Sequence, residues 1–174
     1  MRTSIIEKIK NLVQNKIMSK AREIDNKKPY DLVFLDWNLQ GMNGIETVIK
    51  LKTEISSPLP DIIMVSAYGK EEVQKSAEEV GINHFLSKPV SKSQLIDCLM
   101  SIFTLNHSDV PLISENNYPD LKGKRVLLVE DNEINRQIAS ELFESIGLLF
   151  EEAYNGNDAI SKVFKKHYRF TCRS

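Results

Sequence analysis

The sequence predicts an α/β fold with a doubly wound, parallel sheet of five strands. Three predicted strands are short, wholly apolar runs without alternation, at residues 32–35, 62–65 and 126–129. Runs of this kind are typical of strands that helices cover on both faces. Segments with helical periodicity alternate with the strands, which indicates right-handed βαβ units. With 174 residues, of which 41% are hydrophobic, the chain is long enough for one compact body with a real core.

The N-terminal segment, residues 1–30, predicts an amphipathic helix and a turn. Apolar side chains recur at helical spacing from Ile5 to Ile17, so a helix is expected over residues 4–23. The favoured interpretation is a helix that covers one face of a sheet. A dimerisation or coiled-coil arm is the alternative, but the stripe is short for that role. Pro29 indicates the turn that follows, since proline biases its predecessor toward extended geometry.

The rest of the chain divides into two structured parts joined by a linker. Residues 31–103 predict strand 32–35, helix 44–55, strand 62–65, helix 70–80, a weaker strand 84–86, and helix 91–103 with Ser91 as its N-cap. Residues 104–123 have no periodicity and many turn-forming residues, so they predict a linker. Residues 124–174 predict strand 124–129, helix 132–146, strand 148–153 and a helix from Gly156.

Three polar side chains directly follow apolar strands of the first part. They are Asp36, Ser66 and Lys88. Parallel strands bring their carboxyl ends to one edge of the sheet, where such folds bind ligands. A carboxylate at this edge can act as a nucleophile toward a phosphoryl group, while a hydroxyl and an ammonium group can bind phosphate oxygens.

Two adjacent carboxylates, Glu130 and Asp131, follow a strand of the second part. Beside Asp36 they would repel one another unless a cation lay between them, and oxygen ligands of this kind suit Mg²⁺. The alternative role is to place negative charge at the N-terminus of the helix from Asn132, which the helix dipole favours. The two roles can coexist.

These motifs together resemble the active site of two-component receiver domains, as found in the tandem receivers of hybrid histidine kinases. The matching stretches are Asp31–Gly44, Val65-Ser66-Ala67, Ser87-Lys88-Pro89 and Val126–Asn132. The resemblance implies a flavodoxin-like fold and the following roles: Asp36 as phosphoacceptor; Glu130, Asp131, Asp36 and the backbone carbonyl of Asn38 as Mg²⁺ ligands; Ser66 and Lys88 as phosphate-binding residues; Ser66 and Phe85 as a switch; Pro89 as a cis proline. A plain core role for Phe85 remains the alternative. Gln40, Asn43 and Ser66 depart from the family's usual Pro, Asp and Thr without removing a catalytic group.

The parts of this site appear in reversed order, because a receiver begins with the acidic pair. By resemblance, residues 31–103 supply strands 3 to 5 of a receiver and residues 124–174 supply strands 1 and 2 of a second one. A linker of 20 residues reaches at most about 66–72 Å, ample for the two parts to close into one circularly permuted receiver. A domain-swapped homodimer would make the same contacts between two chains. The helices at residues 4–23 and from Gly156 both resemble the second receiver helix, so one of them must be displaced.

The predicted function is that of a phosphoacceptor in a phosphorelay, with a histidine kinase or histidine phosphotransfer domain as partner. The chain has no kinase-type histidine motif and no Gly-rich ATP loop, so we do not expect an enzyme. One alternative is an inactive, truncated fragment of a hybrid histidine kinase, which the terminal stretch 168–174 favours because it abandons the expected strand. Another is a haloacid dehalogenase-type phosphatase. That family needs an acid where this chain has Asn38.

Composition sets further expectations about partners and location. The net charge of −1 gives no argument for nucleic acid or an anionic membrane as a partner, and no helix-turn-helix pattern follows the receiver-like part. No apolar run approaches the roughly 18 residues of a membrane span. The two cysteines have no metal-ligand or disulfide pattern, which favours a reducing, cytoplasmic setting.

Overall fold

The computed structural model describes residues 28–55, 58–67, 70–103, 118 and 121–171. The predicted N-terminal helix and most of the predicted linker lie outside these residues. The strands are β1 (Leu32–Asp36), β2 (Asp61–Ser66), β3 (His84–Ser87), β4 (Arg125–Val129) and β5 (Leu149–Ala153). The helices are α2 (Gly44–Glu54), α3 (Lys70–Glu79), α4 (Lys92–Phe103), α5 (Glu133–Ser145) and α6 (Gly156–Thr171).

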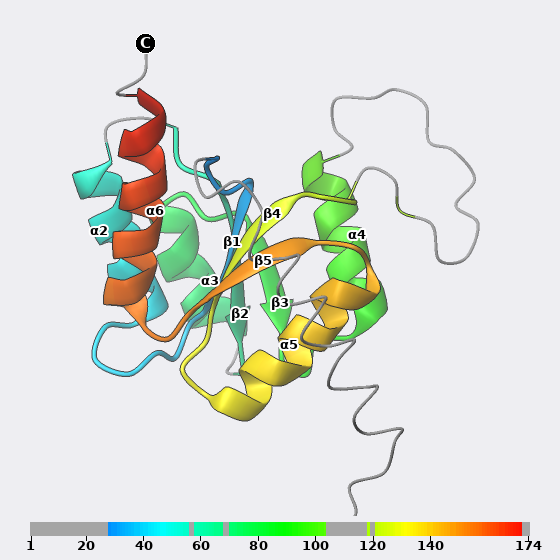
Figure 1. Ribbon diagram of the computed structural model, residues 1–174. Helices are drawn as coiled ribbons and strands as arrows, with labels where there is room; N and C mark the ends of the chain where they lie inside the picture. The colour runs from blue at the N-terminus through cyan, green and yellow to red at the C-terminus, as the bar shows by residue number, and fades with distance from the viewer. Residues whose placement is uncertain (1–27, 56–57, 68–69, 104–117, 119–120, 172–174) are drawn as a thin grey trace, which may run out of the picture.

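The five strands form one parallel sheet in the order β3-β2-β1-β4-β5. This order confirms the predicted doubly wound, flavodoxin-like fold. The central strand β1 pairs with β2 on one side and with β4 on the other, and Leu32 lies opposite Val126 in the β1–β4 register. The two structured parts of the chain therefore join in the middle of a single sheet (Figure 1).

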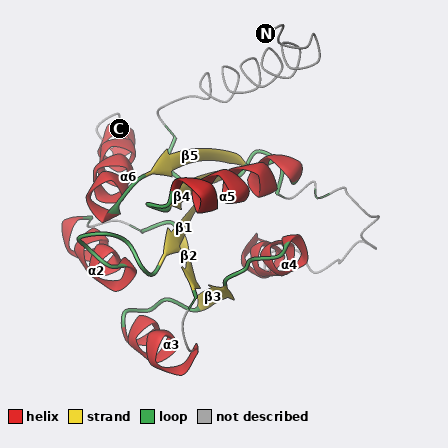
Figure 2. Ribbon diagram, turned by 90° about the horizontal axis from the view of Figure 1, so that it is seen from below, coloured by secondary structure: helices red, strands yellow, loops and turns green. Residues whose placement is uncertain are grey.

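Helices cover both faces of the sheet, with α2, α3 and α6 on one side and α4 and α5 on the other (Figure 2). Side chains of β1 alternate between two cores. Val33 and Leu35 face the core beneath α2 and α6, whereas Leu32 and Phe34 face the core beneath α4 and α5. Both sides of β1 are thus buried, which is why its sequence is apolar without alternation.

Side-chain caps set the starts of three helices. Asn43 forms a reciprocal capping box with Glu46 at α2, and the Asn132 side chain accepts the first free N–H groups of α5. The Oγ of Ser91 accepts the N–H of Gln94 at 3.2 Å, which confirms Ser91 as the cap of α4. Asn43, one of the departures from the family pattern, therefore has a structural role at the loop after β1.

Two features differ in detail from the sequence expectation. Leu121, near the end of the predicted linker, is fully buried in the core beneath α4 and α5, so this part of the segment is anchored to the body. Strand β3, the weakest sequence signal, is half-buried along its whole length at the edge of the sheet. Fewer covering side chains explain its weaker apolar signal.

A partly buried polar cluster joins the start of β1 to the second part of the chain. The Tyr30 hydroxyl donates to Oε2 of Glu151 on β5 at 2.7 Å, and Lys166 of α6 pairs with the same carboxylate. The Lys166 ammonium lies 4.1 Å from the centre of the Tyr30 ring. Burial raises the pKa of Tyr30 above its usual range, and Glu151 raises it further. Because its polar atoms satisfy one another, this cluster ties residues 121 positions apart.

Candidate functional site

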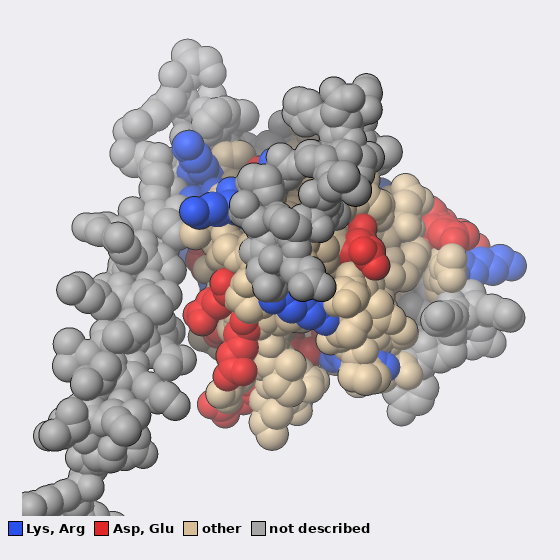
Figure 3. All heavy atoms as spheres, turned by 90° about the vertical axis from the view of Figure 1, so that its right-hand side faces the viewer, with Lys and Arg blue, Asp and Glu red and all other residues tan. Residues whose placement is uncertain are grey.

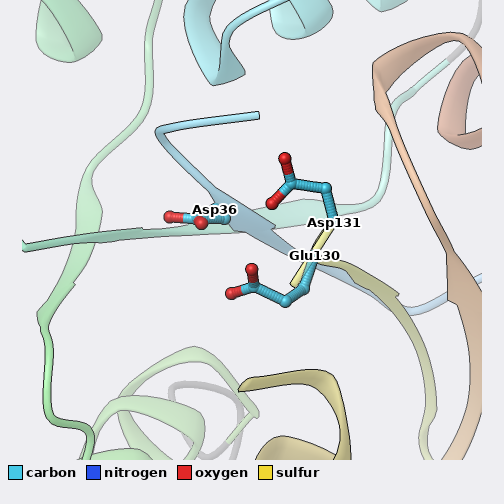
Figure 4. Close-up of side chains that lie close together, drawn as sticks. All are labelled: Asp36, Glu130 and Asp131. Carbon is cyan, nitrogen blue, oxygen red and sulfur yellow. The ribbon is translucent and has the colours of Figure 1, made fainter. Parts of the chain in front are cut away.

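Three carboxylates meet at the carboxyl edge of the sheet. Asp36 ends β1, and Glu130 and Asp131 directly follow the neighbouring strand β4. Each of the three offers an oxygen, and these oxygens lie within 4.8 Å of one another. Figure 4 shows the Glu130 and Asp131 side chains leaving the end of β4 on the side of Asp36. The structure thus brings together the predicted acidic residues from both parts of the chain.

Lys88 lies between two of these carboxylates. Its Nζ is 2.8 Å from Oδ2 of Asp36 and 2.7 Å from Oε2 of Glu130. Burial lowers the pKa of Lys88, but its hydrogen bonds to Asp36 and Glu130 outweigh that effect, so the pKa is raised and the ammonium stays charged. The Lys88–Pro89 peptide bond is cis. The predicted lysine therefore contacts both the strand-end aspartate and Glu130 of the acidic pair.

The donor set suits a divalent cation. Asp36 and Glu130 are only 6% and 5% exposed, and Asp131 is half-buried. Three carboxylates against one ammonium leave an excess of negative charge in a poorly hydrated place, which is costly without a further cation. Oxygen-only ligands with open positions are typical of Mg²⁺ sites. The residues present therefore fit the metal that the sequence predicts.

The remaining predicted site residues lie nearby with different relationships. Asn38 is exposed in the loop after β1, and its N–H is 3.4 Å from Oδ1 of Asp36. Ser66 ends β2, half-buried, and its backbone carbonyl accepts the N–H of Lys88 at 3.0 Å. Phe85 on β3 is half-buried and packs on the core beneath α2 and α6. Phe85 is therefore placed as a partly exposed core side chain, and its switch role stays a prediction.

Sequence reasoning did not identify the groups that hold the acidic pair. The N–H of Gln40 donates to Oδ2 of Asp131 at 3.0 Å, a contact that the family's usual proline could not make. The N–H of Asn132 donates to Oε1 of Glu130 at 3.1 Å. Nη1 of Arg136 donates to the backbone carbonyls of both acidic residues. The two backbone donors carry no side-chain signal, and Arg136 reads as an ordinary helix residue in the sequence.

Gly44 allows the loop after β1 to close against Asp36. A Cβ on Gly44 would lie 2.9 Å from the Asp36 carbonyl oxygen and 3.1 Å from Cα of Trp37. Both are backbone atoms, which cannot move aside cheaply. The Gly44 N–H also donates to the Trp37 carbonyl at 2.9 Å. The loop after β1 is therefore tight, and the close approach of two backbone segments is the reason for glycine at this position.

An apolar hollow of about 380 Å³ opens beside the site between α5 and residues 88–90, which follow β3. Asp36, Lys88 and Glu130 lie at its polar end, while Leu142 and Phe143 of α5 line its wall. Two isoleucines of α5, Ile134 and Ile138, are 69% and 58% exposed, and Ile138 also lines the hollow. Figure 3 views the molecule from the right-hand side of Figure 1 and shows uncharged side chains between scattered acidic and basic ones on the described surface.

Comparison with known proteins gives relatives that match about half of the chain. The chain is 39% identical over 80 residues to the phosphate regulon transcriptional regulatory protein PhoB of Pseudomonas aeruginosa, which is 45% of this chain and 34% of that protein. It is 27% identical over 104 residues to the chemotaxis protein CheY-3 of Vibrio cholerae, 55% of this chain and 80% of that protein. Over 93 residues it is 25% identical to histidine kinase 1 of Arabidopsis thaliana, 51% of this chain and 8% of that protein. The chain thus spans about a third of the length of the PhoB relative.

A family model described as the response regulator receiver domain matches residues 4–100. The matched stretch contains Asp36, Ser66 and Lys88, whereas Glu130 and Asp131 lie beyond it. Among the described residues, no helix is both long and apolar enough to cross a membrane. The match covers more than half of the sequence and agrees with the sheet order and with the residues at its carboxyl edge, so this chain belongs to the response regulator receiver domain family.

Proposed function

We propose that this chain is a phosphorelay receiver that takes a phosphoryl group from a phosphohistidine onto Asp36, in a site that Glu130, Asp131 and Lys88 complete. The observation that carries the proposal is the joint contact of Lys88 with Asp36 and Glu130, at 2.8 and 2.7 Å. This contact links the strand-end aspartate, inside the family match, to Glu130, which lies outside it. The chain acts as an acceptor, and a partner supplies the phosphoryl group.

Asp36 is the nucleophile in the transfer. One of its carboxylate oxygens attacks phosphorus, so that an O–P bond forms while the P–N bond of phosphohistidine breaks. The imidazole nitrogen leaves with that electron pair and takes a proton from water. Lys88 pairs with a phosphate oxygen and Ser66 donates to another, which offsets the charge on the transferred group.

Glu130, Asp131, Asp36 and the Asn38 carbonyl would hold Mg²⁺. When bound, the ion supplies positive charge beside the transferred phosphate oxygens. Lys88 would then share the neutralisation of Glu130 with the ion, and its ammonium group could pair with the transferred phosphoryl group. Ser66 and Phe85 form the proposed switch. Movement of Ser66 toward the phosphate would shift the adjoining strand β3, which carries Phe85.

The proposed partner is a histidine kinase or a histidine phosphotransfer domain. It would dock on the exposed isoleucines of α5, Ile134 and Ile138, of which Ile138 lines the hollow beside the site. An apolar contact there would exclude water from the transfer. No part of the proposal needs nucleic acid or a membrane surface as a partner. The two cysteines have no disulfide pattern in the sequence, which favours a cytoplasmic setting.

The chain is further proposed to derive from the tandem receiver region of a hybrid histidine kinase. In this view residues 31–103 come from one receiver, residues 124–174 come from the next, and the linker 104–123 lets them close as a permuted unit. The similarity to a histidine kinase supports this origin. The alternatives, an inactive fragment and a domain-swapped homodimer, make different predictions for phosphorylation and for assembly.

Phosphorylation by acetyl phosphate with Mg²⁺ tests the proposal. We expect the intact chain to gain one phosphoryl group at Asp36, located by peptide mass spectrometry. Asp36→Asn should abolish the gain. Asp61→Asn is the matched control, because Asp61 is an exposed aspartate at the opposite end of a strand. If the intact chain takes no label, the inactive-fragment alternative replaces the proposal, and equal labelling of Asp36→Asn would show that the nucleophile is another residue.

A further inference from the structure

We propose that Arg136 is a positioning residue that holds Glu130 and Asp131 in the arrangement that binds the metal. This inference rests on the proposed function, in which the acidic pair is part of a Mg²⁺ site. Arg136 lies in the first turns of α5, and its N–H donates to the carbonyl of the cap residue Asn132 at 3.0 Å. Its side chain returns from the helix toward the end of β4.

One nitrogen of Arg136 binds two successive carbonyl groups. Nη1 is 3.0 Å from the Glu130 carbonyl oxygen and 3.3 Å from that of Asp131. Along a regular strand, neighbouring side chains point to opposite faces. Here the carboxylates of both neighbours lie near Asp36, so the backbone must turn between them. Two carbonyls held by one guanidinium fix the two peptide planes of that turn, and with them the directions of both side chains.

The guanidinium is itself held in place by β5 and by the turn after it. Nε of Arg136 pairs with Oε2 of Glu152 at 3.2 Å, and the other Glu152 oxygen accepts the Ser140 hydroxyl at 3.1 Å. The guanidinium also lies 4.6 Å from the centre of the Tyr154 ring. With only 13% of its side chain exposed, Arg136 has little freedom to swing away. It is therefore a fixed support rather than a mobile surface charge.

Removal of the Arg136 guanidinium should lower Mg²⁺ affinity while the protein stays folded. Groups that orient metal ligands typically change metal affinity by about 10–100-fold when they are lost. A lysine at this position keeps the charge, but it lacks the planar fork that binds carbonyls on one nitrogen and Glu152 on another. Arg136→Lys therefore separates orientation of the ligands from simple charge balance.

The test is calorimetric titration of the full chain with Mg²⁺, with Trp37 fluorescence as a second readout. Trp37 is the only tryptophan and directly follows Asp36. We expect Arg136→Met and Arg136→Lys each to lower Mg²⁺ affinity by about 10–100-fold. Lys162→Met is the matched control. Lys162 of α6 pairs with Asp158 and lies over the Tyr154 ring, at 5.6 Å. It binds the backbone carbonyl of Glu152 and not the carboxylate that holds Arg136. Its loss should leave Mg²⁺ affinity unchanged.

Several outcomes would overturn the inference. Intact-like Mg²⁺ affinity in folded Arg136→Met would show that the turn holds without the guanidinium, and intact-like affinity in Arg136→Lys would show that charge alone matters. Should Arg136→Met fail to fold, Glu152→Gln removes the anchor while keeping Arg136, and unchanged affinity there would count against the inference. In all these cases the intact chain still binds Mg²⁺, so the proposed function stands. If the intact chain binds none, the proposed metal site fails, and this inference fails with it.

Discussion

Nζ of Lys88 lies 2.7 Å from Oε2 of Glu130, although 42 residues separate the two in sequence. Lys88 follows the edge strand β3, and Glu130 follows β4 on the other side of the central strand β1. The contact therefore crosses the junction between the two structured parts of the chain. Asp36, at the end of β1, accepts the second hydrogen bond of the same ammonium. The site is complete only when both parts share the sheet.

Loss of Lys88 should destabilise the fold in a way that Mg²⁺ repairs. In Lys88→Met, Asp36 and Glu130 face each other without a cation, and breaking a buried ion pair in this way costs several kcal/mol. We expect about 2 kcal/mol here, because a quarter of the Lys88 side chain is exposed. Urea unfolding with and without Mg²⁺ measures the effect. Mg²⁺ should stabilise Lys88→Met more than the intact chain, and equal Mg²⁺ effects would contradict a shared cation position.

Glu151 should make the fold sensitive to acid. Burial raises its pKa, but the bonds from Lys166 and Tyr30 outweigh burial, so the folded-state pKa lies below 4.5. Its stabilising contribution is therefore present above that pH and is lost as the pH falls through the folded pKa. The difference in unfolding free energy between the intact chain and Glu151→Gln should shrink as the pH is lowered below 4.5.

Denaturant titrations across this pH range check the Glu151 prediction. Tyr30→Phe, which removes the hydroxyl donor and keeps Lys166, should lower the unfolding free energy by about 1 kcal/mol at neutral pH. The difference between this variant and the intact chain should vary less with pH than the difference for Glu151→Gln. A difference between intact and Glu151→Gln proteins that stays constant down to low pH would show that the carboxylate is not preferentially charged in the folded state.

The contact between α2 and α6 should behave as a coupled pair in a double-mutant cycle. A Cβ on Gly156 would lie 2.3 Å from Oγ1 of Thr47, which is fully buried. Gly156→Ala should therefore destabilise the fold by about 1–3 kcal/mol. In combination with Thr47→Ala, which removes the obstructing atom, the loss should be smaller than the sum of the single losses by more than about 0.5 kcal/mol. If the losses of unfolding free energy measured in urea were additive, α2 and α6 would be shown to move apart and relieve the contact, and the coupling would be absent.

Much of the fold and the site could be predicted because strand-end residues carry a strong local signal. Asp36 and Glu130 follow runs buried on both faces, so their place at the edge of a parallel sheet follows from the pattern alone. Arg136 and Tyr30 could not be assigned in this way. Their partners lie on other elements, and Tyr30 meets Glu151 across 121 residues, so the contacts depend on helix rotation and strand register. The Gln40 contact depends on a backbone N–H, which every residue except proline carries.

The most direct test of a site completed within one chain mixes two inactive variants. Asp36→Asn lacks the proposed nucleophile, and Asp131→Asn lacks a ligand from the other part of the chain. The two proteins are unfolded together, refolded as a mixture, and treated with acetyl phosphate and Mg²⁺. If each chain closes on itself, the intact protein gains a phosphoryl group, whereas each variant and the mixture gain none. Labelling of the mixture, with an assembly twice the mass of one chain, would contradict this account, because exchange between two chains would then have rebuilt one complete site.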